Sequence, residues 1–457
     1  MDKVTTTQGV LFKELNKRPV VVKFDQDHAS SDGGALLLKS CDQKLKLSEA
    51  IASCLDDTRQ AGKVRHSLVE LLQQRLFGMA CGYADGNDAA GLVNDPVFKL
   101  LLGRDPLLGD TLASQPTLSR FENSACAGQL LKMGEALADC VIERHRRRKK
   151  KVKRITLDFD PTDDPTHGAQ QLTFFNWTYD NWCYLPLTGF MTFDAEPEQY
   201  LFCYALRAGN VPAKKGLLGI LKRLLPKLRN AFGKAKIRIR LDAGFTGPEL
   251  FEFFETNRME YVVCMAKNPV LERLAAPLMA RYREALESGG DASPVYGEAR
   301  YQARSWSRER RVILRANIIE HPGRAPKDNV RFLITNIRGW PKPLYERAYC
   351  QRADVENRIK ELKIGLQIDR TSCSRFFANQ FRALLTAAAY VLMQELRLKA
   401  RYTRCAHSQV TTLQLRLLKI GAWVEQSVRR IVLHLPSSTA YADDWRHIAR
   451  SIGALPT

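Results

Sequence analysis

The sequence predicts an α/β protein in which helices flank a mixed β-sheet and a helical N-terminal domain precedes it. Apolar residues before about position 143 recur at three- and four-residue spacing, as in SLVELLQQRLFGMACGY (67–83) and CAGQLLKMGEALADCVIERH (126–145). From residue 154 the pattern changes to short runs rich in aromatic and branched residues. Strand and helix patterns then alternate between residues 217 and 266. Together these three observations predict the fold class.

The first strands are expected at RITLDFD (154–160), YLPLTGFMTF (184–193) and QYLFCYALRA (199–208), and their short connections suggest a meander. A helix at 217–230, a strand at 236–242, a helix at 248–258 and a strand at 261–266 follow as β-α-β alternation. The runs YQARSWS, RRVILRANII and VRFLITNI indicate extended structure between residues 270 and 340. Helices are expected from there to the end.

These patterns divide the chain into five segments. They are a helical N-terminal domain (1–150), the first part of the core (151–269), a mostly β insertion (270–340), a core helix segment (341–395) and a C-terminal helical region (396–457).

Composition and charge indicate which classes of partner the protein can bind. The chain has 457 residues, 45% of them hydrophobic, and a net charge of +21, so a polyanion such as nucleic acid is the expected partner. A membrane partner is not expected, since the longest apolar stretch, at about 383–393, is shorter than the roughly 18 to 20 residues that span a bilayer. The N-terminus lacks a signal-peptide pattern. We expect a cytoplasmic protein.

A run of cations joins the first two segments. Residues 144–154 contain nine Lys or Arg side chains, among them Arg146, Arg147, Arg148, Lys149, Lys150 and Lys151. The run is either a charged connector or a contact for nucleic-acid phosphates. Cysteines and histidines, by contrast, show no CxxC or zinc-ligand spacing.

Two predicted strands end in an aspartate. RITLDFD places Asp158 and Asp160 on one face, and KIRIRLD ends at Asp242 before an Ala-Gly-Phe turn. Carboxylates at strand ends of an α/β sheet lie where ligands bind, and they can share a hard cation such as magnesium. The alternative is that each aspartate only forms a turn or caps a helix.

A third carboxylate lies in the predicted helix YCQRADVENRIKELKIGL (349–366). On an ideal helical wheel one face carries Tyr349, Arg352, Glu356, Lys360 and Lys363. A carboxylate among cations can bind a metal while its neighbours hold phosphates. The alternative is a surface helix whose glutamates and lysines pair three and four residues apart.

The spacing Tyr349-x2-Arg352-x3-Glu356-x6-Lys363 resembles the YREK signature of hairpin-forming, insertion-sequence 4-like transposases. The segments LDFDPTDDPTHG (157–168), FFNWTYDNWCYLPL (174–187), LDAGF (241–245) and ENRIKE (356–361), with YADGNDAAGLVNDP (83–96) and SQPTLSRFEN (114–123), resemble the insertion-sequence 1380 group. The resemblance covers about residues 28–395.

The resemblance implies an RNase H-like core with a β insertion between the second aspartate and the glutamate. Asp160, Asp242 and Glu356 would be the catalytic residues and would hold two Mg²⁺ ions, with Mn²⁺ as a possible substitute. Asp158 is the alternative to Asp160 as the first carboxylate, and Asp163 and Asp164 receive no role.

The resemblance also implies DNA contacts. Tyr349, Arg352 and Lys363, with Lys360 beside them, would grip phosphates near the cut. Trp306 or Trp340 would be a platform on which a flipped base stacks. The partners would be double-stranded DNA, as terminal inverted repeats and target, and a second copy of the chain in a synaptic homodimer. The N-terminal domain would recognise the repeats, and the bacterial protein would associate with the nucleoid.

The function expected from this resemblance is excision and integration of an insertion sequence by nicking, hairpin formation and strand transfer. Two alternatives stay open. One is a catalytically inactive, domesticated DNA-binding protein that keeps the fold and charge. The other is an RNase H-like nuclease that hydrolyses DNA without strand transfer.

Overall fold

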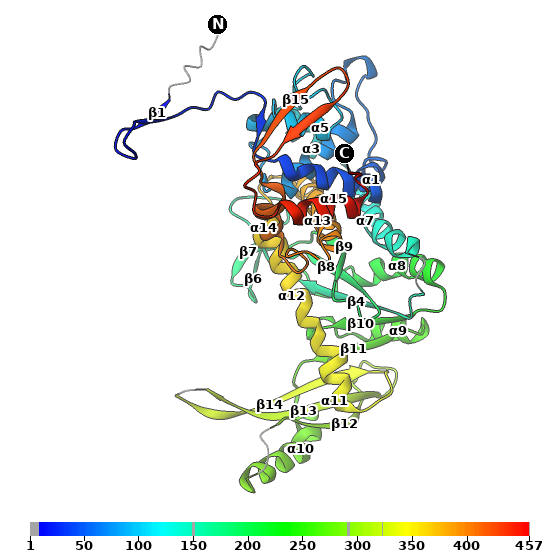
Figure 1. Ribbon diagram of the computed structural model, residues 1–457. Helices are drawn as coiled ribbons and strands as arrows, with labels where there is room; N and C mark the ends of the chain where they lie inside the picture. The colour runs from blue at the N-terminus through cyan, green and yellow to red at the C-terminus, as the bar shows by residue number, and fades with distance from the viewer. Residues whose placement is uncertain (1–8, 149–150, 290–292, 322, 457) are drawn as a thin grey trace.

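The computed structural model describes residues 9–148, 151–289, 293–321 and 323–456 (Figure 1). Its centre is an eight-stranded sheet in the order β12-β13-β14-β11-β10-β4-β8-β9. β4, β10 and β11 are parallel to one another, and the other pairings are antiparallel, so the sheet is mixed as predicted. The strands are β4 (Arg154–Pro161), β8 (Leu187–Phe193), β9 (Tyr200–Ala205), β10 (Lys236–Leu241), β11 (Glu260–Met265), β12 (Val295–Tyr301), β13 (Arg310–His321) and β14 (Arg324–Thr335).

The predicted meander is confirmed, because β8 pairs antiparallel with β4 on one side and with β9 on the other. The strand expected at 184–193 is interrupted, however, and β8 begins only at Leu187. Pro186 lacks a backbone N–H and so cannot donate to a ladder. Residues before it form a separate small sheet of β5 (Asp164–Pro165), β7 (Asn181–Tyr184) and β6 (Phe174–Asn176), in that order.

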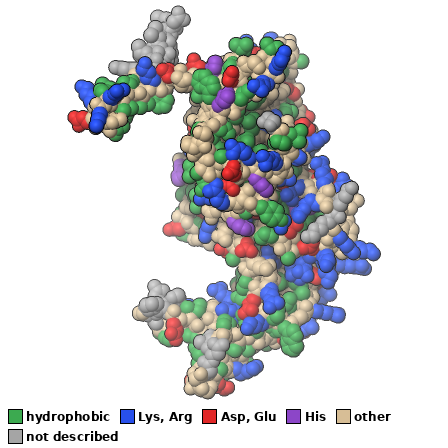
Figure 2. All heavy atoms as spheres, in the orientation of Figure 1, with side chains coloured by type: hydrophobic (Ala, Val, Ile, Leu, Met, Phe, Trp, Pro, Cys, Tyr) green, Lys and Arg blue, Asp and Glu red, His purple; other side chains and the backbone are tan. Residues whose placement is uncertain are grey.

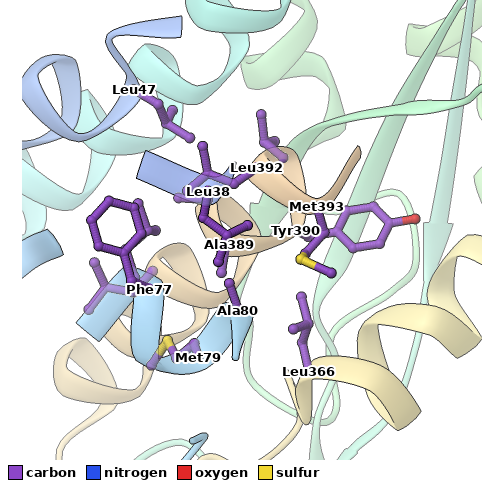
Figure 3. Close-up of a cluster of buried hydrophobic side chains, with 14 of the residues drawn as sticks. Leu38, Leu47, Phe77, Met79, Ala80, Leu366, Ala389, Tyr390, Leu392 and Met393 are labelled. Atoms are coloured by element: carbon purple, nitrogen blue, oxygen red, sulfur yellow. The ribbon is translucent and has the colours of Figure 1, made fainter. Parts of the chain in front are cut away.

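Helices pack around this sheet. α9 (Pro248–Thr256) connects β10 to the parallel β11, which confirms the β-α-β unit. α8 (Leu217–Phe232) packs on the long α7 (Ala127–Arg147). α13 (Phe376–Lys399) is buried along most of its length and contacts β9, α3 and α1. Figure 3 shows its residues Ala389, Tyr390, Leu392 and Met393 packed among apolar side chains of the N-terminal domain.

The N-terminal segment is mainly helical from residue 33. Before α7 it contains α1 (Leu36–Leu45), α2 (Leu47–Ala52), α3 (Leu68–Ala80), α4 (Ala89–Leu92), α5 (Pro96–Leu101) and α6 (Gln115–Glu122). A hairpin of β1 (Val10–Phe12) and β2 (Val20–Val22) precedes the helices and projects away from the body in Figure 1. Within the described residues, no helix has both the length and the apolarity needed to cross a lipid bilayer.

Two expectations for the later chain need correction. α10 (Pro269–Glu287) occupies a stretch predicted as extended; Asn268 caps its first turn and Pro269 is its first residue. The C-terminal region is not wholly helical, since β15 (Ala422–Gln426) and β16 (Ile431–His434) lie between α14 (Val410–Leu413) and α15 (Ala442–Ile452). β15 also pairs with β3 (Ala29–Ser30) near the other end of the chain.

The predicted helix at 349–366 lies within a longer helical stretch of mixed geometry. It begins with α11 (Pro341–Pro343), and residues 344–349 and 361–365 form π-helical turns on either side of α12 (Ala353–Lys360). A π turn contains more residues than an α turn, so the ideal wheel holds only within α12. Tyr349, Arg352 and Lys363 therefore lie next to different neighbours.

Candidate active site

The first two carboxylates meet because of strand register. β4 and β10 are parallel and in register, with Asp158 opposite Arg240, so two residues further along Asp160 and Asp242 leave neighbouring strands at the same edge. Asp242 also caps the short turn 243–245, because its Oδ1 accepts a hydrogen bond of 2.9 Å from the Gly244 N–H. The turn-forming interpretation of this residue is thus correct, and the turn does not use Oδ2.

Asp158 lies on the same face of β4 but has a different environment. It is completely buried, and both of its oxygens accept hydrogen bonds of 2.7 Å from the guanidinium of Arg240. Arg240 also donates to the Ala348 carbonyl at the start of the helical stretch above the sheet. In this bidentate pair each carboxylate oxygen accepts one charge-assisted hydrogen bond. Asp158 therefore links β4 to β10 and, through Arg240, to this helix.

A single guanidinium bridges Asp160 and Asp242. Arg352 Nη2 lies 2.6 Å from Asp160 Oδ1 and 3.4 Å from Asp242 Oδ2. Arg352 is largely buried, and its Nε has no hydrogen-bond partner. Burial raises the pKa of Asp160 to about 7; Arg352 opposes this rise, and the negative charges of Asp242 and Glu356 add to it. The two aspartates thus form a concentrated negative site that holds one cationic group.

Glu356 is an exposed residue one turn after Arg352 on α12. Its helix is fixed by the buried Glu361, which accepts hydrogen bonds of 2.7 Å from both Tyr390 and Arg397 of α13. Arg397 is itself held by Glu198 at 2.7 Å. This buried network fixes the helix against the core and so positions Glu356, whose negative charge acts on Asp160.

The other signature residues take separate positions. Lys363 Nζ lies 2.8 Å from Asp163 Oδ1, beyond the end of β4. Tyr349 is half-buried between Tyr345 and Cys264, and burial raises its pKa. Lys360 is exposed. The structure therefore brings Arg352 to the carboxylates, while Tyr349 and Lys363 lie on either side of them along the helix.

The residues present suit a divalent cation. Asp160 and Asp242 are oxygen donors that already share one positive nitrogen, and hard cations prefer such donors. As they stand, no three His, Cys, Asp or Glu side chains of the described chain are arranged to hold a metal ion. Glu356 would supply the third carboxylate from the helix, and Arg352 would have to leave.

The cationic run lies at the opposite end of β4 from the carboxylates, roughly 20 Å away at about 3.3 Å per residue. Arg146 and Arg147 pair with Glu143, and Arg148 pairs with Glu196 at 2.7 Å. Lys151 is exposed, whereas Lys149 and Lys150 lie outside the described residues. Figure 2 shows Lys and Arg side chains gathered on this side of the molecule, around the end of α7 and α8.

The two tryptophans expected to stack on a base differ in their exposure to solvent. Trp306 is buried against Phe251, Tyr301 and the guanidinium of Arg310, which leaves it little surface for a base. Trp340 is 82% exposed, but it precedes α11, roughly 20 Å along the helical stretch from Glu356. The base-stacking role of either ring stays a prediction.

Sequence reasoning missed two contributors to the site. Arg240 could have been noticed because the alternation of Arg238, Arg240 and Asp242 directs charge to one face of an otherwise buried strand. The β6–β7 hairpin also adjoins the site, since Tyr179 donates to the Pro161 carbonyl at 3.4 Å. Its tryptophans and tyrosine, spaced around a polar turn in NWTYDNW, were the available signal.

Comparison with known protein families identifies the family to which the chain belongs. The model of the family described as transposase DDE domain group 1 matches residues 12–457. The chain belongs to this family. Because the match covers nearly the whole chain, it extends from the N-terminal helices through the candidate site to α15, and it supports a DDE transposase that acts on DNA. A comparison with curated proteins returned no match.

Proposed function

We propose that the chain is a DNA transposase that excises and integrates an insertion sequence, with Asp160, Asp242 and Glu356 as its catalytic residues. The observation that carries this proposal is the meeting of Asp160 and Asp242 at the ends of parallel β4 and β10, bridged by Arg352 from the helix that also carries Glu356. A meander followed by two parallel strands in one mixed sheet supports an RNase H-like core.

The three carboxylates would hold two Mg²⁺ ions, or Mn²⁺ in their place. Bound there, such ions activate an attacking oxygen and stabilise a leaving oxygen in in-line phosphoryl transfer. Arg352, released from the aspartates, would make a bidentate phosphate contact, and Lys363 would act as a point charge. Tyr349 and Lys360 would contact the same strand.

In this proposal water first nicks the element's end, and the freed 3′-hydroxyl then attacks the opposite strand to give a hairpin. Water reopens the hairpin, and the same hydroxyl finally attacks target DNA. The complete Tyr349, Arg352, Glu356 and Lys363 spacing supports assignment to the hairpin-forming, insertion-sequence 1380 group. Joining two element ends calls for a homodimer on DNA.

The test uses the full chain and end-labelled DNA that carries the terminal repeat of its own element, with and without Mg²⁺. We expect Mg²⁺-dependent nicks at the element boundary that convert to hairpins on a denaturing gel. Nicks that never convert would indicate the nuclease alternative, and binding without cleavage would indicate a domesticated DNA-binding protein.

A matched pair of variants tests the assignment of the glutamate. Glu356→Gln keeps the side-chain shape but removes a negative ligand, so cleavage should be lost while DNA binding remains. Asp354→Asn removes an equally exposed charge from the same helix and should keep cleavage. Equal losses in both variants, or loss of DNA binding in Glu356→Gln alone, would contradict the catalytic role.

A further inference from the structure

Two basic residues of the signature helix are already paired with carboxylates in the free protein. Arg352 Nη2 lies 2.6 Å from Asp160 Oδ1 and 3.4 Å from Asp242 Oδ2. Lys363 Nζ lies 2.8 Å from Asp163 Oδ1, just beyond the end of β4. Both cationic side chains are largely shielded from solvent. The groups proposed to hold DNA phosphates are therefore neutralised by the acidic edge of the sheet when no DNA is bound.

The contact of Arg352 with Asp160 and Asp242, which we call the arginine bridge, depends on charges of both signs. If Arg352 moved to a phosphate and no cation replaced it, the two aspartates would lose the charge that compensates them in a largely buried site, which is costly. If a cation displaced Arg352 with no phosphate nearby, the guanidinium would lose its ion pair, and its Nε already lacks a hydrogen-bond partner. The exchange is therefore most favourable when a cation and a phosphate arrive together.

The helix that carries Arg352 also carries the third carboxylate. Glu356 lies one turn after Arg352 on α12, and its negative charge acts on Asp160. Over the part of the chain that the structure describes, these carboxylates do not form a group that could hold a metal ion. π-helical turns at 344–349 and 361–365 flank α12, and such turns occur frequently at functional sites. A single shift of α12 between them would withdraw Arg352 and bring Glu356 forward.

We propose that Arg352 couples the binding of a divalent cation to the binding of DNA. In the free protein the arginine bridge blocks Asp160 and Asp242, and a DNA phosphate draws the guanidinium away as the cation enters. The free protein is thus autoinhibited until a strand lies at the acidic edge. This inference rests on the proposed function, which places a phosphate there, and it assigns the regulation of that site. By linkage, DNA and the cation must raise each other's affinity by the same factor.

The coupling has a specific consequence for DNA affinity. Without a divalent cation Arg352 stays on the aspartates and contributes little to DNA binding. With a cation present it is released, and its charge-assisted contact with a phosphate is worth about 10- to 150-fold in affinity. Lys360 is an exposed cation on the same helix and has no part in the arginine bridge, so its contribution to DNA binding should be the same in both conditions.

The experiment measures DNA binding rather than cleavage. Fluorescently labelled duplex DNA that carries the terminal repeat of the element is titrated with the full-length protein, and its anisotropy gives the dissociation constant. One series contains EDTA and the other contains Ca²⁺, a hard cation that binds carboxylate oxygens, at the same ionic strength. The variants are Arg352→Ala, Arg352→Lys, which keeps the positive charge, and Lys360→Ala as the matched control. Circular dichroism checks that each variant is folded.

Arg352→Ala should bind DNA about 10- to 150-fold more weakly than the wild type in Ca²⁺. In EDTA the loss should be less than about threefold, because only screened charge is removed. Arg352→Lys should lose less, again only in Ca²⁺, since lysine makes no bidentate contact. Lys360→Ala should lose the same factor in both series.

Equal losses for Arg352→Ala in both series, a loss only in EDTA, or no loss in either would overturn the proposal. So would a Lys360→Ala loss confined to Ca²⁺, which would show that the cation acts on every basic residue of the helix. If the wild type bound DNA in neither series, the proposed function itself would fail. Because no cleavage is measured, the result is independent of the Glu356→Gln test.

Discussion

Replacing Arg352 by alanine should tighten divalent-cation binding by the protein alone, even though the variant loses a residue proposed to hold DNA. The guanidinium Nη2 stands between Asp160 Oδ1 and Asp242 Oδ2, at 2.6 Å and 3.4 Å. A metal ion that binds these oxygens has to displace it. In the free protein Arg352 therefore competes with metal for these oxygens, and removing Arg352 should favour the metal-bound form.

The size of the effect follows from the contact that is lost. A hydrogen bond between charged groups contributes about 1.5–3 kcal/mol, and the 2.6 Å contact is much the stronger of the two because 3.4 Å is long for an N–H···O bond. One such bond corresponds to metal binding about 10- to 150-fold tighter in Arg352→Ala, at 1.4 kcal/mol per tenfold. The gain should shrink as the pH falls toward 7, because protons compete for Asp160, whose pKa is about 7.

The assay is calorimetric titration of the DNA-free protein with Mn²⁺ at pH 8.5. Lys360→Ala serves as the control, since it removes an exposed cation from the same helix; its effect on Mn²⁺ affinity should be less than about threefold because surface charge is screened. The reasoning would be refuted if Arg352→Ala bound Mn²⁺ no more tightly than the wild type, or if Lys360→Ala gained as much.

Three further predictions concern stability. Burial raises the pKa of Asp164 from 3.8 to about 8, so the protonated form is favoured in the folded state and stability is lost as pH rises through 8. Between pH 7 and 9 this group should lower the free energy of unfolding by about 1.4 kcal/mol in urea denaturation. Asp164→Asn should remove most of the slope, and Asp160, whose pKa is about 7, accounts for part of the remainder. An unchanged slope would show that another group titrates. Asp158→Asn should lower the free energy of unfolding by about 3–5 kcal/mol, because Arg240 is left buried without its charged partner. If the variant kept wild-type stability but lost cleavage, Asp158 would instead be a catalytic ligand. In Gly34→Ala the new Cβ would lie 1.7 Å from Leu417 O, so the C-terminal segment would be displaced. Limited proteolysis should then cut residues 419–457 faster than in the wild type. An equal rate of cutting would count against the packing of Gly34 on Leu417.

The sheet and its acidic edge could be predicted because they depend on local patterns. Alternation in RITLDFD and KIRIRLD marked the strands, and each ended in a carboxylate. What each carboxylate does could not be predicted, because it depends on register. Only the pairing of β4 with β10 places Arg240 opposite Asp158, so both oxygens of Asp158 pair with Arg240, whereas Asp160 pairs with Arg352.

The missed elements have physical explanations too. In α10 the apolar residues Leu271, Ala275, Leu278 and Tyr282 follow a helical period, but extended runs after residue 295 dominated the interpretation of the whole stretch. β15 and β16 are short, and β15 depends on a partner strand near the start of the chain. Pairing between such distant segments leaves no local signal.

That pairing has a consequence for how the protein is made. In the pairing of β3 with β15, Ser30 lies opposite Ala422 and Ala29 opposite Trp423. The Gly33 N–H also donates to Ile420 O at 2.8 Å. The ribosome releases β3 long before it synthesises β15. The N-terminal domain therefore lacks this partner strand during almost the whole of translation. A polypeptide that stops early leaves this edge open and exposes apolar surface to chaperones and proteases. The fold thus makes completion of translation a condition for a fully assembled N-terminal domain.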